Sequence, residues 1–99
     1  MVKHIVMWKL KEEAHGNDKA TNAKLIKEKL EALSGQIEGL QKIEVGIDFL
    51  GGGNFDVVLY SELSAKSDLD FYQNHPLHQA TLPFIREAVM DRKAVDYEI

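Results

Sequence analysis

The chain of 99 residues contains no cysteine. Disulfide bonds, thiolate nucleophiles and Cys-ligated zinc are therefore excluded. The sequence also lacks any apolar run close to the roughly 20 residues that a membrane span needs. Its opening apolar stretch is short and interrupted by charged residues, unlike a signal peptide. We therefore expect a cytoplasmic protein with no membrane partner.

The chain also has fewer basic than acidic residues. The chain has 12 basic and 16 acidic residues, which gives a net charge of −4. No basic footprint indicates a nucleic-acid partner. The length suits one domain, residues 1–99, and a domain this small buries only roughly 60–65% of its unfolded-chain surface. A second copy packed against the first would therefore add stability.

Four segments have the pattern of β-strands. Residues 2–11 read as a strand with large apolar side chains on both faces, and apolar and polar residues alternate in residues 43–49. Residues 55–60 are rich in β-formers, and residues 90–99 read as a final strand. The segment Gly-Gly-Gly-Asn at 51–54 joins two of these strands. Because Gly and Asn tolerate positive φ angles, this segment predicts a hairpin turn.

One helix is predicted between the first two strands. Asn17 or Asp18 can cap its start, and Gly35 or Gly39 can end it. Its apolar stripe repeats at helical spacing through Ala23, Ile26, Leu30, Leu33 and Ile37.

A second helical region follows the hairpin. Ser64 or Ser67 can cap it, and it is expected to run to about Asn74. Pro76 suits the first turn of a new helical segment. Pro83 either interrupts that segment or begins its last portion.

The resulting order is β-α-β-β-α-β, the split βαβ or ferredoxin-like α+β pattern with a four-stranded antiparallel sheet. Two helical regions can cover only one face of such a sheet. The other face is expected to carry Trp8 or Met7, together with Val58 and Tyr60. Since an apolar face of this size is rare in monomers, two copies are expected to pair through it as a homodimer.

Histidines gather in two places that the fold could bring together. His78 is the strongest candidate for a general acid or base, because imidazole exchanges protons near neutral pH; the alternative is that it only holds a turn. His75 precedes a proline, so a capping role competes with ligand binding. His4 is either a pocket residue or a hydrogen-bonded core histidine. His15 lies in a polar loop and is expected to be solvated.

Other chemistries have weaker support. His75-x-x-His78 with His4 could resemble a metal site, but the proline can turn the two rings apart and no usual ligand set is completed. We therefore expect no metal and no cofactor. Trp8 and Tyr60 are candidates to line a cavity, although aromatic residues on strands are often plain core.

Several segments resemble the Dabb family of stress-responsive dimeric α/β barrel domains. These are Val2-Lys3-His4-Ile5-Val6, the helix that ends in Tyr72, the turn His75-Pro76-Leu77-His78, and the closing Asp96-Tyr97. The resemblance covers essentially the whole chain and implies a homodimer whose two sheets close into a barrel with helices outside.

The resemblance also implies possible chemistry. One plant member of the family is a polyketide cyclase, and its motif positions correspond to His78 as base, Tyr72 as carbonyl donor and His4 in the pocket. Many members have no assigned activity. We therefore consider three functions: binding of a small apolar or phenolic molecule in the homodimeric barrel, a cofactor-independent cyclase-like or isomerase-like enzyme, and a structural dimer with a filled barrel.

Overall fold

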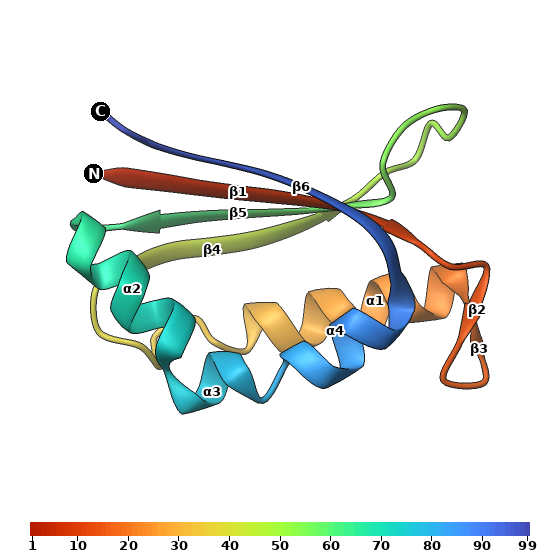
Figure 1. The fold of residues 1–99 in the computed structure, drawn as a ribbon, viewed down its shortest axis with the longest axis horizontal. Helices are drawn as coiled ribbons and strands as arrows, with labels where there is room; N and C mark the ends of the chain where they lie inside the picture. Colours follow the sequence, from red (N-terminus) through yellow and green to blue (C-terminus); the bar gives the residue numbers. More distant parts are fainter.

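The computed structural model describes residues 1–99 and contains a four-stranded antiparallel sheet with all helices on one face (Figure 1). The sheet is formed by β1 (Val2–Leu10), β4 (Leu40–Ile47), β5 (Val57–Leu63) and β6 (Val89–Glu98). The helices are α1 (Lys19–Glu31), α2 (Lys66–Asn74), α3 (Pro76–Gln79) and α4 (Leu82–Ala88). Two short strands, β2 (Glu13–Ala14) and β3 (Asn17–Asp18), form a separate pair. The predicted ferredoxin-like α+β fold is confirmed.

The strand order is β4-β5-β1-β6, so the first and last strands of the sheet lie side by side. Both chain termini lie at the same end of this pair (Figure 1). His4 is opposite Asp96 and Trp8 is opposite Arg92. Because side chains on paired strands share a face at opposite positions, these four residues all belong to the helix-covered face.

Strict alternation in β1 decides which residues face the helices. Every second residue from Val2 to Leu10 is buried, which places His4 and Trp8 in the helix-covered layer. The opposite, open face of the sheet carries Met7 and Tyr60, which remain partly exposed. Of the two residues considered for the uncovered face, Met7 is therefore there and Trp8 is not.

Helix α1 begins where the sequence indicates but ends earlier. The backbone N–H of Thr21 donates to Asp18 Oδ1 at 2.8 Å, which confirms the predicted N-cap. The helix ends at Glu31, and the prediction that Gly35 or Gly39 marks its end was wrong. Tight i→i+3 hydrogen bonds continue the chain beyond the helix, so the whole predicted apolar stripe is still buried: Ala23, Ile26, Leu30, Leu33 and Ile37.

Helix α2 starts without a side-chain cap. Ala65 occupies the N-cap position, so the prediction of Ser64 or Ser67 was wrong. The helix ends at Asn74, as predicted, and Pro83 lies in the first turn of α4. None of the helices has the length and apolar character needed to cross a bilayer.

The pair β2–β3 was not predicted. His15 occupies its turn with φ of 55°, and it is not simply solvated. Its Nε2 donates to the carbonyl oxygen of Phe84 at 2.9 Å, and its ring stacks on the Phe84 ring with centroids 4.1 Å apart. His15 therefore fastens this turn to α4.

Candidate functional site

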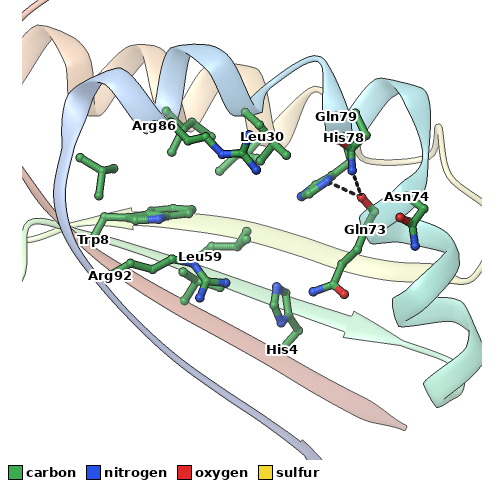
Figure 2. Close-up of a pocket in the computed structure, with 14 residues that line it drawn as sticks. His4, Trp8, Leu30, Leu59, Gln73, Asn74, His78, Gln79, Arg86 and Arg92 are labelled. Atoms are coloured by element: carbon green, nitrogen blue, oxygen red, sulfur yellow. Dashed lines mark hydrogen bonds between the residues drawn. The ribbon is translucent and has the colours of Figure 1, made fainter.

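A cavity of about 490 Å³ lies between the sheet and the helices of the single chain (Figure 2). Its size is in the range of small-molecule pockets. It lies on the helix-covered side of the sheet, whereas the ligand site predicted from the sequence lay in the barrel between two sheets. The lining residues come from β1, β5, β6 and all four helices: His4, Val6, Trp8, Leu30, Leu59, Gln73, Asn74, His78, Gln79, Leu82, Ile85, Arg86, Val89 and Arg92.

His78 is brought into the cavity wall by the chain break between α2 and α3. Since Pro76 cannot continue α2, the chain restarts as α3 and directs the His78 ring toward the sheet (Figure 2). The His78 Nδ1–H donates to the carbonyl oxygen of Gln73 at 3.1 Å. A carbonyl can only accept, so in the neutral ring the free lone pair is on Nε2.

Burial lowers the pKa of His78. The hydrogen bond to Gln73 opposes this shift, and the positive charge of a protonated His4 adds to it. His78 is therefore neutral at pH 7 and has the protonation state of a general base.

His4 lies across the cavity on β1 and is almost completely buried. Its Nδ1–H donates to the Asp96 carboxylate on β6. This contact fixes the orientation of the ring, in the way that a carboxylate orients a catalytic histidine. No carboxylate could be picked from the sequence to orient His78, and in the structure Asp96 contacts His4 instead.

Tyr72 lies behind the two histidines, fully buried at the end of α2. Its ring centroid is 4.5 Å from that of His78 and 6.3 Å from that of His4. The structure thus brings together the three residues that the resemblance singled out. Tyr72 does not itself line the cavity.

The Tyr72 hydroxyl has no hydrogen-bond partner, although it is buried. Burial raises its pKa to about 12, so the phenol keeps its proton at physiological pH. Leaving a buried hydroxyl unpaired destabilises a fold by about 1–3 kcal/mol. This uncompensated donor is the kind of group that a functional site retains.

The other predicted residues divide between the site and its surroundings. Trp8 lines the cavity. Tyr60 does not, because it lies on the open face of the sheet, where Lys3 Nζ donates to its hydroxyl oxygen at 2.9 Å. His75 caps α3: its Nδ1 accepts from the backbone N–H of Leu77 at 3.1 Å.

The histidines do not form a set of metal ligands with neighbouring residues. His75 and His78 engage different backbone partners, so their rings do not converge. No group of three His, Cys, Asp or Glu side chains is placed to hold a metal ion.

Two cavity residues, Arg86 on α4 and Arg92 on β6, were not identified from the sequence. Arg92 lies on an edge strand that is exposed along nearly its whole length, so no burial pattern singles it out. Its position opposite Trp8 could have been found only from the pairing of the first and last strands.

Residues 2–99 match the family described as the stress responsive A/B barrel domain. A dimeric protein of unknown function from Bacteroides fragilis is 38% identical, with a TM-score of 0.88 over 99% of this chain and 95% of the other. A dimeric ferredoxin-like protein of unknown function from Thermobifida fusca is 25% identical, with a TM-score of 0.85 over 99% and 90% of the two chains.

A hydroxynitrile lyase from Passiflora edulis shares the fold at 17% identity, with a TM-score of 0.80 over 99% of this chain and 92% of the lyase. No curated protein matches the sequence. The family match spans nearly the whole chain and agrees with the fold. The chain therefore belongs to the stress responsive A/B barrel domain family.

Proposed function

We propose that the protein binds a small carbonyl compound of apolar or phenolic character in the cavity between sheet and helices. There it moves a proton on the carbon next to the carbonyl, as a cyclase, lyase or isomerase does. His78 is the base, and Tyr72 and His4 supply the hydrogen-bonding surroundings.

The observation that carries this proposal is the pair of imidazoles that line one cavity, each held by its Nδ1. Asp96 can compensate a positive charge on His4, whereas His78 has no carboxylate partner. The two rings therefore differ in role: His78 has no carboxylate partner and takes the proton, whereas His4 is held in place by Asp96. This separation of two similar groups by their surroundings is typical of acid–base sites.

The proton-transfer step follows from this arrangement. His78 Nε2 takes a proton from the carbon next to the carbonyl, and the C–H electron pair forms an enolate. We propose that the enolate oxygen is stabilised by the Tyr72 O–H, which keeps its proton because of its raised pKa and which must turn out of its buried position to reach the cavity. The imidazolium returns the proton to carbon or to a leaving group, so His78 ends the cycle neutral.

Each site lies within one chain, and the protein is proposed to act as a homodimer. The open face carries the apolar side chains of Ile5, Met7 and Val58, which a second copy would cover. The B. fragilis and T. fusca relatives are dimeric. A purely structural dimer has less support, because the single chain already contains a cavity of about 490 Å³ lined by titratable groups.

Solvent deuterium exchange tests the proposed chemistry directly. 4-Hydroxyphenylacetone, a phenolic ketone, is incubated with the protein in D₂O, and deuterium in its methylene group is followed by NMR. The wild type is expected to accelerate exchange over buffer, and His78→Ala to lower this acceleration on the order of 10²–10⁴-fold.

His75→Asn is the matched control, since it removes an imidazole from the same turn while asparagine remains a good N-cap. It is expected to keep the exchange rate within about threefold, because His75 is not in the cavity wall. Equal acceleration by wild type and His78→Ala, or no acceleration by the wild type, would contradict the proposed function.

A further inference from the structure

The cavity has a cationic end that the proton-transfer chemistry does not use. The chain contains only two arginines, Arg86 and Arg92, and both line this cavity, while none of its lysines does. Figure 2 shows the two guanidinium groups entering the space from opposite sides, Arg86 from α4 and Arg92 from β6.

Neither guanidinium is engaged by the protein. The ion pairs of the chain involve lysines and His4, and neither arginine takes part in one. The cations that lie over aromatic rings are all lysines. Both arginines therefore have their hydrogen-bond donors available.

The charge of the cavity wall is opposite to that of the whole chain. Acidic residues outnumber basic ones by 16 to 12 overall, but the wall includes no aspartate or glutamate. A cleft lined by one sign of charge concentrates ligands of the other sign. Guanidinium groups also match a carboxylate geometrically, because two N–H groups can donate in parallel to its two oxygens.

The arginines are separated from the histidines along the sheet. Arg92 is opposite Trp8, and Asp96 is opposite His4, so the two positions are four residues apart along the strand, on the order of 13 Å. Apolar side chains of Val6, Leu30 and Leu59 line the wall as well. The cavity thus has a cationic end, an apolar lining and an acid–base end.

We infer that Arg86 and Arg92 form a carboxylate-binding subsite, so that the substrate is an elongated aromatic or aliphatic keto acid with its carboxylate at the arginines and its carbonyl at His78. This inference rests on the proposed function for the role of His78. It adds the anionic group and the orientation of the substrate.

Two probes of nearly the same shape, one charged and one neutral, show whether binding depends on the negative charge of the ligand. 4-(2-Oxopropyl)benzoate carries a carboxylate across the ring from a ketone side chain, and 4-(2-oxopropyl)benzamide is its neutral counterpart. Binding is measured by calorimetry at low salt. The wild type is expected to bind the carboxylate at least about tenfold more tightly than the amide.

Arg86→Gln, Arg92→Gln and the double variant are measured with both probes. Each single variant should reduce the preference for the carboxylate, and the double variant should remove it. Lys93→Gln is the charge-matched control: it lies next to Arg92 but is opposite Met7 on the open face, so the preference should persist. Thermal denaturation establishes that each variant is folded.

Binding and chemistry are read separately. In His78→Ala the preference for the carboxylate should persist, while deuterium exchange into the benzoate probe is lost. A preference without exchange in the wild type would contradict the proposed chemistry but support the subsite. Equal binding of the two probes, binding of neither, or a preference that survives the double arginine variant would overturn the subsite.

Discussion

The two faces of the sheet both carry titratable side chains in ordered contacts, but they use them differently. On the helix-covered face, His4 is held by Asp96 beside a cavity. On the open face, Lys3 donates to Tyr60 and Glu62 at 2.9 and 2.8 Å. The lysine lowers the pKa of the Glu62 carboxyl, and every polar group in that cluster has a partner within it.

The difference indicates where chemistry is possible. The polar groups of Lys3, Tyr60 and Glu62 on the open face bond to one another, so they hold neighbouring strands together and leave no group free to bind a ligand. The helix-covered face leaves a free imidazole nitrogen on His78, an unpaired hydroxyl on Tyr72 and two unpaired guanidinium groups beside the cavity. Satisfied polar networks stabilise, whereas retained unsatisfied groups point to function.

Replacing one carboxylate on each face gives the largest expected contrast. Asp96→Asn should lower the rate of deuterium exchange on the order of 10²–10⁴-fold, since an amide can hold the His4 ring in the wrong tautomer. Glu62→Gln, the matched change on the open face, should leave the rate within about threefold. Similar losses in both variants would show that the two faces are not functionally distinct.

Adding a charge to the open face tests its proposed role in dimerisation. Met7→Asp would place an unpaired carboxylate in the interface of both copies and should weaken dimerisation by at least about 10²-fold. Sedimentation at micromolar concentration measures this. Ala20→Asp adds the same charge on the exposed surface of α1 and should leave the mass unchanged. A monomeric wild type would contradict the dimer proposal.

Removing a tyrosine hydroxyl should have opposite effects on the two faces. Tyr72→Phe removes an unpaired buried hydroxyl and should raise the free energy of unfolding by about 1 kcal/mol while lowering exchange activity. Tyr60→Phe breaks hydrogen bonds to Lys3 and Glu62 and should lower the free energy of unfolding by about 0.5–1.5 kcal/mol. Chemical denaturation measures both. A loss of stability in Tyr72→Phe would mean that its hydroxyl is paired.

The smallest predicted effect is a pH dependence of stability. The folded pKa of His78 lies below its ordinary value of 6.5, so unfolding takes up a proton as the pH falls below 6.5. The stabilisation is complete above pH 6.5 and is lost as the pH falls through the folded pKa. His78→Asn should therefore show a flatter decline of unfolding free energy below pH 6.5 than the wild type, in denaturant titrations. Parallel profiles would contradict the lowered pKa.

Apolar periodicity and the helix break at Pro76 predicted the order of strands and helices, because both signals are local. The grouping of His4, Tyr72 and His78 was implied by the family resemblance, since no local signal brings β1 next to the turn between α2 and α3. The sequence was less informative about which residues of each strand face the helices. Strand β5 has apolar residues on both faces, such as Leu59 on one and Val58 on the other. The sequence pattern therefore could not show that Tyr60 faces away from the helices.

The rest of the site depends on long-range pairing. Asp96 reaches His4, and Arg92 reaches the cavity, only because β6 pairs with β1, more than 80 residues away in the chain. Their strand is exposed on both faces and has no burial pattern. Ala65, and neither nearby serine, is the N-cap of α2, with no side-chain hydrogen bond to the first turn.

Chemical-shift mapping with 4-hydroxyphenylacetone reports which face of the sheet the ligand contacts. We expect shifts concentrated at the Trp8 indole, the His78 ring and the Arg86 amide, with Met7, Val58 and Tyr60 unperturbed. Shifts concentrated at those three open-face residues, with none at His78, would contradict a site on the helix-covered face.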